Sequence, residues 1–310
     1  MANATEWVGV ANGHDGTVVV GTDPSTSSYS YISTANVLTP VVISGETFTT
    51  VVYHRGWYLY GSGTGKLWWS DVSNTVDGLN FAAAEASRDR IVKLIDIGPA
   101  VAVFGERTIE FWASTGNADA VFSPIPEATQ KIGIGNPNHV KKIGKAVYFW
   151  GFPEHGTPGL YLLDGMQYKR LSTEDIEREL GAGIVDDWFY IHVDGFELRG
   201  HVFVHVSHRF EAETAMLDVS TGVWTIIGAG DPYSGVCHFA SGYGIVYVAS
   251  ATGLGEIDPK AVDEVDRLIV TDHITDENFE RITMGSVRVD CGGMSQIRLR
   301  VSRDGGISWG

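Results

Sequence analysis

Short apolar runs alternate with glycine-rich or charged turns along most of this chain. Five units repeat the same order: an apolar run, a turn, and a second apolar run that ends near Asp, Ser or Pro. The runs are rich in β-branched and aromatic residues, which predicts pairs of antiparallel strands rather than helices. The units are Trp57–Asp71, Val101–Ser114, Val147–Asp164, Val202–Asp218 and Ile245–Pro259.

The spacing of these units indicates how the strands assemble. Successive units begin about 43 to 55 residues apart. This period is typical of β-propellers, in which each blade is a four-stranded sheet packed between its neighbours. Partial units near Val18 and Ile297 extend the pattern towards both ends. We therefore predict an all-β fold, a single β-propeller domain over residues 1–310 with five to seven blades. Partial blades are expected within 1–50 and 285–310, and closure of the propeller is left open.

Two glycine-containing turns need an interpretation, because each could be read as a site. Gly105–Thr108 separates two apolar runs, so we predict a hairpin tip with Glu106 and Arg107 facing water. Gly61–Leu67 looks superficially like a phosphate-binding loop, but that loop requires Ser or Thr after its lysine, at the start of a helix. Lys66 is followed by Leu67 and a strand-like run, so this turn is also predicted to be a hairpin.

One stretch, residues 172–180, has the pattern of a helix. Ser172 can cap it, Asp175 lies at the capping-box position, Arg178 follows Glu174 by four residues, and a glycine follows the stretch. We predict a short helix in a connection between two blades. The alternative is an element that contacts a neighbouring subunit.

Charge and composition argue against several classes of protein. The net charge of −16 argues against a protein that grips phosphates, since affinity for nucleic acid comes mainly from Lys and Arg. It is compatible with a surface past which DNA slides without sticking. Cys237 and Cys291 are expected to be free thiols in a reducing compartment. We expect neither a secretory leader nor a membrane span, because no suitable apolar run is found.

The sequence contains few residue patterns that are typical of metal sites or of catalytic sites. Four histidines fall within one unit, but no cysteine or acidic cluster accompanies them in register, so we interpret them as ordinary strand residues rather than metal ligands. They are His192, His201, His205 and His208. Asp186, Asp187 and Asp194 do not have calcium-loop spacing, and no Gly-x-Ser-x-Gly elbow occurs. We therefore predict no catalytic residue, cofactor or metal, and no enzymatic activity.

The last residues contain the spacing Ser-x-Asp-x-Gly-x-x-Trp, known as the Asp-box. It is formed by Ser302, Asp304, Gly306 and Trp309. In this β-hairpin the acid satisfies amides of its own turn while the tryptophan packs beneath it, so its role in propellers is structural. Together with the nine tryptophans, the Asp-box leaves open an alternative, a glycan- or receptor-binding, sialidase-like propeller.

Several stretches resemble the packaged-DNA stabilisation proteins of short-tailed bacteriophages, the tail hub or nozzle family. The resemblance covers about residues 56–310 and is most specific around "FGERTIEFWASTG" and "LSTEDIE". Where this family has Pro-Phe, the chain carries Val121-Phe122. The positions that match the family pattern are Phe104, Gly105, Glu106, Arg107, Thr108, Glu110, Trp112, Ser172, Thr173 and Glu177.

The resemblance implies a structural protein of the virion tail that is assembled in the host cytoplasm. Its expected partners are further copies of itself in a ring, taken as a hexamer, the portal and its head-to-tail adaptor, and a distal needle, fibre or spike. Double-stranded DNA would pass through the bore without sequence-specific binding. A general intracellular propeller scaffold is the third hypothesis.

Overall fold

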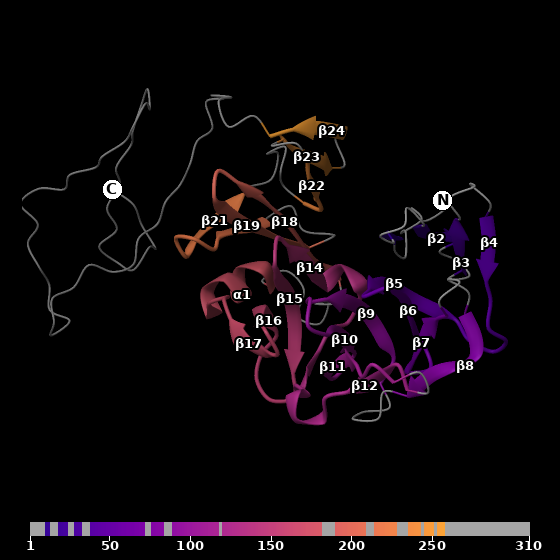
Figure 1. Cartoon of the computed structure of the whole chain (residues 1–310). Helices are drawn as coiled ribbons and strands as arrows, with labels where there is room; N and C mark the ends of the chain where they lie inside the picture. The colour runs from indigo at the N-terminus through magenta and orange to yellow at the C-terminus, as the bar shows by residue number, and fades with distance from the viewer. Residues whose placement is uncertain are drawn as a thin grey trace, which may run out of the picture. The chain divides into compact units, whose positions relative to one another are not determined.

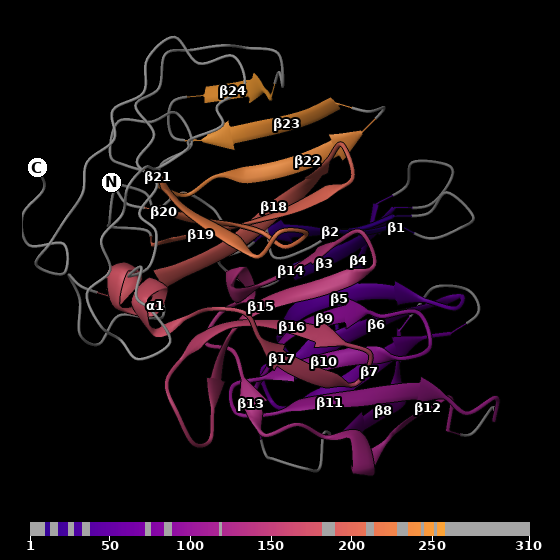
Figure 2. The same cartoon turned by 90° about the vertical axis from the view of Figure 1, so that its left-hand side faces the viewer.

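The computed structural model of the chain describes residues 10–12, 18–23, 28–32, 38–71, 76–83, 89–117, 120–181, 190–208, 214–227, 235–242, 245–250 and 253–257. The chain divides into two compact units, Met1–Pro259 and Lys260–Gly310. Every element described below belongs to the first unit, which Figures 1 and 2 show from two sides.

The described strands form six antiparallel sheets. The first sheet contains β1 (Val10–Asn12), β2 (Val18–Asp23), β3 (Ser28–Ile32) and β4 (Leu38–Val41). The second contains β5 (Phe48–His54), β6 (Trp57–Ser62), β7 (Lys66–Ser70) and β8 (Val76–Ala83). The third contains β9 (Ile91–Asp96), β10 (Val101–Gly105), β11 (Ile109–Ser114) and β12 (Phe122–Pro124).

The remaining three sheets follow in chain order. The fourth contains β13 (Ile132–Gly133), β14 (Val140–Ile143), β15 (Ala146–Pro153), β16 (Gly159–Asp164) and β17 (Gln167–Arg170). The fifth contains β18 (Ile191–Leu198), β19 (His201–His208), β20 (Thr214–Asp218) and β21 (Val223–Ile227). The sixth contains β22 (His238–Gly242), β23 (Ile245–Ser250) and β24 (Gly253–Glu256). Two 3-10 turns, η1 (Pro126–Ala128) and η2 (Pro137–His139), lie around β13.

Within each sheet the strands pair in sequence order as a meander, the pattern expected of propeller blades. Only the fourth sheet departs from it, because β13 and β14 pair with different stretches of β15. The predicted apolar pairs correspond to β6 and β7, β10 and β11, β15 and β16, β19 and β20, and β23 and β24. Edge strands of several neighbouring sheets contact one another, as in β5 with β9, β14 with β18, and β18 with β22. The described sheets agree with the all-β propeller class predicted from the sequence.

The apolar core is divided into layers between neighbouring sheets. Phe104 of the third sheet packs edge-on against Phe149 of the fourth, with ring centroids 5.4 Å apart. Trp150 and Val204 belong to a layer between the fourth and fifth sheets. Phe196 lies 4.9 Å from Phe239 between the fifth and sixth. Apolar positions on both faces of a strand are therefore buried, which explains why these strands read as continuous apolar runs.

Both glycine-containing turns are hairpins, as predicted. The Gly105 amide donates to the Thr108 carbonyl at 2.8 Å, and Glu106 and Arg107 are exposed. In the other turn the Gly65 amide donates to the Ser62 carbonyl at 3.1 Å. Gly65 has φ of +81°, in the left-handed region that glycine adopts without strain.

The predicted helix is present as α1 (Glu174–Gly181), in the connection between β17 and β18. Its predicted cap was wrong by one residue. The Ile176 amide donates to Thr173 Oγ1 at 3.5 Å, whereas the Ser172 hydroxyl is occupied by the Glu177 carboxylate. Arg178 pairs with Asp175, three residues before it, rather than with the predicted Glu174; both spacings place side chains on the same face of a helix.

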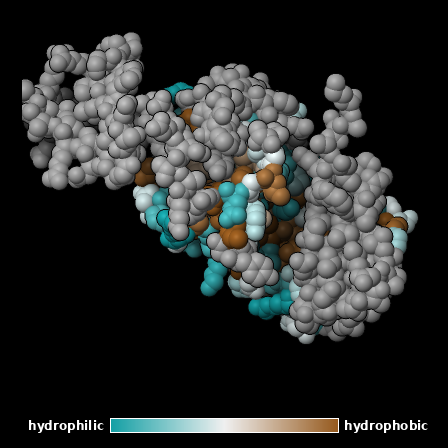
Figure 3. Space-filling model, turned by 90° about the horizontal axis from the view of Figure 1, so that it is seen from above, coloured by the Kyte–Doolittle hydropathy of each residue, from teal (hydrophilic) through white to brown (hydrophobic). Residues whose placement is uncertain are grey.

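Two further expectations fall on the described residues. Cys237 is buried and is not part of a disulfide, whereas Cys291 lies outside the described residues. In the part of the chain that the structure describes, none of the helices has the length and apolar character needed to cross a lipid bilayer. On the face in Figure 3, hydrophobic and hydrophilic residues are interspersed where they are visible.

Candidate functional site

The family-motif residues of the third sheet build the β10–β11 hairpin. Phe104 and Trp112 are fully buried on neighbouring strands, in different apolar layers. Glu110 is also buried, and its carboxylate accepts a hydrogen bond of 3.0 Å from Trp112 Nε1. This pairing satisfies two polar groups that would otherwise be costly to bury. The motif therefore maintains two layers of the core at once.

A carboxylate from the preceding loop holds the tip of this hairpin. Asp89 Oδ2 accepts from the Arg107 amide at 2.7 Å and from the Thr108 amide at 3.0 Å. The Thr108 hydroxyl lies 3.3 Å from the same oxygen. A Cβ atom on Gly105 would lie 2.8 Å from Asp89 Oδ2, so glycine is needed for the carboxylate to approach. Sequence reasoning missed Asp89, because it lies 18 residues from Arg107.

The next segment of the chain closes over the hairpin tip. The Ile134 amide donates to the Gly105 carbonyl at 2.9 Å, and Ile109 and Gln130 exchange backbone hydrogen bonds of 2.9 Å. A Cβ atom on Gly133 would lie 2.2 Å from the Glu106 carbonyl carbon. The motif is thus a joint between the third and fourth sheets, in which the peptide group between Glu106 and Arg107 packs against Gly133 while both residues remain exposed on their other side.

The second group of motif residues anchors α1. Glu177 is buried and accepts hydrogen bonds from Arg170 Nε at 2.9 Å, Arg170 Nη2 at 2.5 Å and the Ser172 hydroxyl at 2.5 Å. The Leu160 amide in turn donates to Ser172 Oγ at 2.9 Å. Bidentate pairing with arginine is a strong, geometrically specific interaction. It attaches the helix to the fourth sheet, with Thr173 as the helix cap.

The Asp-box residues Ser302, Asp304, Gly306 and Trp309 lie outside the described residues. The histidines of the fifth sheet are placed as expected for strand residues. His192, His205 and His208 are buried, and His201 pairs with Asp218 at 2.8 Å. Asp194, which sequence reasoning set aside, joins one of these histidines in a cluster.

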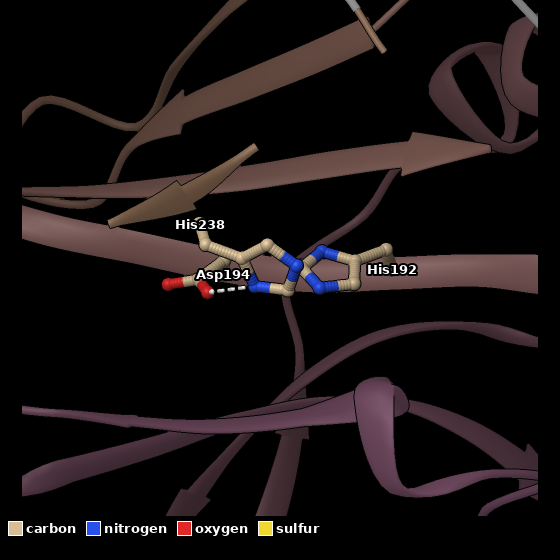
Figure 4. Close-up of side chains that lie close together, drawn as sticks. All are labelled: His192, Asp194 and His238. Carbon is tan, nitrogen blue, oxygen red and sulfur yellow. Dashed lines mark ion pairs between the residues drawn. The ribbon is translucent and has the colours of Figure 1, made fainter. Parts of the chain in front are cut away.

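This cluster consists of His192, Asp194 and His238, whose candidate ligand atoms all lie within 4.8 Å of one another. His192 and Asp194 are two residues apart on β18 and so share a face, whereas His238 begins β22 of the next sheet. Figure 4 shows the two imidazole rings directed towards each other with the carboxylate beside His238. The ring centroids are 4.6 Å apart and nearly perpendicular.

Asp194 is held firmly in this cluster. Lys141 Nζ lies 2.8 Å from Oδ1 and 3.0 Å from Oδ2, and the Gly195 amide donates to Oδ1 at 2.7 Å. Burial alone would raise the pKa of the Asp194 carboxyl. Hydrogen bonds from His238 and Lys141, with the lysine charge, nevertheless hold that pKa below its ordinary value.

His192 has the opposite environment. Its side chain is buried, and its Nδ1 atom has no hydrogen-bond partner. Burial, followed by the charge of nearby His238, lowers the pKa of His192 to about 3. The imidazole is therefore neutral at physiological pH.

A hollow of about 310 Å³ lies beside this cluster. It is bounded by edge strands of three neighbouring sheets, β14, β18 and β22. Among its lining residues are Lys141, Gly195, Phe196 and Phe239, two of which flank the cluster residues in sequence.

The chain matches the family model described as Bacteriophage P22 Gp10, beta-propeller, over residues 2–267. The chain belongs to this family. It is a bacteriophage structural protein, and the described sheets and motif residues agree with the propeller named in that description. The family membership predicted from "FGERTIEFWASTG" and the flanking stretches is confirmed.

Other comparisons add little to this assignment. No curated protein matches the sequence. The solved structures of similar fold include BamB from Moraxella catarrhalis, with 13% identity, a TM-score of 0.43, and coverage of 80% of this chain and 81% of that chain. A chain of the Mitotic Checkpoint Complex has 11% identity, a TM-score of 0.48, and coverage of 80% and 75%. Because both TM-scores are below 0.5, the family match alone carries the assignment.

Proposed function

We propose that this protein is the tail hub, or nozzle, of a short-tailed bacteriophage. Copies of the chain form a ring below the portal and its adaptor, retain packaged double-stranded DNA, and form the conduit for its ejection. Six copies are expected in the ring. The observation that carries this proposal is the family match over residues 2–267, together with the matched motif residues in the described sheets.

The described geometry suits a mechanical role without turnover. The Asp89 carboxylate, the β10–β11 tip and the segment that closes over it form a rigid joint between two sheets. The net charge of −16 gives the protein little long-range attraction for a polyanion. We therefore propose that the protein holds its position by packing against other proteins and works without catalysis.

Cryo-electron microscopy of intact virions tests the placement. The expected result is a sixfold ring of this chain on the tail axis, in contact with the adaptor on one side and the distal tail proteins on the other. A tail in which this chain is absent from the axis, or is present as isolated monomers at the periphery, would contradict the proposal.

A packaging experiment tests the retention of DNA separately. Particles assembled without this protein are expected to package DNA and then lose it, measured as nuclease-sensitive DNA per head. Particles supplied with purified protein after packaging should retain their DNA. Full retention in the unsupplemented particles would contradict the proposed role, even if the ring were found on the tail.

The glycan-binding alternative receives no support from the described tryptophans. Sugar stacking requires an exposed ring, but within the described ranges each tryptophan is buried or half-buried. Trp112 and Trp150 are completely buried. A glycan array probed with the full chain distinguishes this alternative, since specific binding would favour a receptor-binding propeller of the tail.

A further inference from the structure

We propose that His192, Asp194 and His238 form a binding site for a divalent transition-metal ion, of which Zn²⁺ is the expected occupant. The ion would join β18 of the fifth sheet to β22 of the sixth. This inference is independent of the proposed role in the tail, because it depends only on side chains of the described strands.

The ligand set fits the chemistry of zinc. Two imidazoles and one carboxylate are a known three-ligand combination for this ion, with water completing a tetrahedral site. The candidate ligand atoms lie within 4.8 Å of one another. Zn–N and Zn–O bonds are about 2.0 to 2.2 Å long, so the three side chains need only a modest closure to reach a common ion.

Two of the three ligands are already positioned. His192 is 5% exposed, and its Nδ1 atom is buried without a hydrogen-bond partner, so a metal would satisfy a nitrogen that now carries an energetic cost. Asp194 is oriented by Lys141 and by the Gly195 amide. Ligating carboxylates commonly carry such outer hydrogen bonds, which fix their orientation.

The third ligand, His238, lets an ion reach the site from solvent and can turn towards it. The side chain of His238 is 62% exposed, and its Nδ1 atom lies 3.5 Å from Asp194 Oδ2. Exposure gives this ring freedom to turn towards an ion and leaves room for a water ligand. The positive charge of Lys141 repels a cation, so the site should bind more weakly than one with the same ligands and no nearby lysine.

Calorimetric titration of the full chain with ZnSO₄, after removal of metal by a chelator, tests the site. The wild-type protein is expected to bind Zn²⁺, and His238→Asn should lower the affinity by at least about tenfold. His201→Asn is the matched control, because His201 also pairs with an aspartate but lies outside the cluster. Its affinity should equal that of the wild type.

Cobalt provides a second readout that reports on geometry. Co²⁺ is expected to give the strong visible absorption of a tetrahedral complex in the wild type and in His201→Asn, and to lose it in His238→Asn. Circular dichroism checks that each variant is folded. The proposal is overturned if the wild type binds no Zn²⁺, or if His238→Asn binds it as tightly as the wild type does.

Discussion

Gly133 lies where only a hydrogen atom fits between two segments of backbone. A Cβ atom there would come within 2.2 to 2.3 Å of the peptide group between Glu106 and Arg107. Backbone atoms cannot rotate away as the end of a side chain can, so the two segments would have to separate. The close approach at this one residue is therefore a condition for the joint between the third and fourth sheets.

We expect Gly133→Ala to lower the free energy of unfolding by about 1 to 3 kcal/mol, the usual cost of overpacking. Gly63→Ala is the control, since its Cβ would meet only the Thr47 carbonyl oxygen, at 4.0 Å. Chemical denaturation monitored by tryptophan fluorescence measures both variants. Equal stabilities of the two variants would show that the two backbone segments can separate at little cost in free energy.

His192 predicts a pH dependence of stability. Its pKa is about 3 in the folded chain, lowered by burial and by the charge of His238, against about 6.5 when unfolded. Below pH 6.5 the unfolded chain therefore binds a proton that the folded chain does not, and stability is lost as pH falls towards 3. Asp194, His205 and Lys141 also act on this imidazole.

In metal-free buffer, this histidine should remove about 2 kcal/mol of stability between pH 7 and pH 5. Unfolding free energies of wild type and His192→Asn across this range measure the effect. The variant should lack that part of the slope, whatever its stability at pH 7. Parallel curves for the two proteins would mean that His192 is protonated as easily in the folded chain as in the unfolded one.

Individual elements were predictable where local chemistry decides them. The apolar runs on either side of a turn located the hairpins from Val101 and Val147, and the helix from residue 172 was found by its capping residues and polar pattern. The cap was misassigned because Ser172 and Thr173 are both good capping residues, and only tertiary contact with Glu177 determines which one is free to cap.

The attachment of α1 shows how burial changes the contribution that an ion pair makes to the stability of the fold. Glu177 and Arg170 form a pair whose carboxylate side chain is 8% exposed, whereas Asp175 and Arg178 form one in which both side chains are more than 70% exposed. Removing one partner of a buried pair leaves an uncompensated group. Exposed pairs contribute little, because water and salt screen them.

We expect Glu177→Gln to lower the free energy of unfolding by about 2 to 4 kcal/mol, since the buried Arg170–Glu177 pair and the Ser172 hydrogen bond are disrupted. Asp175→Asn on the same helix should change it by less than about 1 kcal/mol. Thermal or urea unfolding of the two variants provides the comparison. A larger effect of Asp175→Asn would contradict this account of how the helix is anchored.

At the scale of the whole molecule, the sequence period predicted the sheets but not the cluster between them. His192 and Asp194 could be paired by their spacing on one strand. His238 could not, because it begins another sheet, and no local pattern shows which residues two neighbouring first strands bring together. Asp89 was missed for a different reason: it lies just before β9 of the same sheet, but 18 residues from the Arg107 amide that it accepts from.

The net charge of −16 predicts that the purified protein does not bind duplex DNA at physiological salt. Fluorescence anisotropy of a labelled duplex, titrated with the protein at several salt concentrations, measures this. A basic DNA-binding protein serves as the positive control. Tight binding that weakens steeply with added salt would show a concentrated basic surface despite the acidic total.

The layered core has a mechanical consequence. Each apolar layer belongs to two sheets at once, as the Phe104–Phe149 and Phe196–Phe239 contacts show. Pulling one sheet outward would therefore expose apolar side chains of the neighbouring sheet as well as its own. The free energy needed to separate the first sheet includes the loss of both buried surfaces. Under tension, sheets that share apolar layers should resist up to a threshold force. They should then unfold several at a time, rather than losing one strand after another.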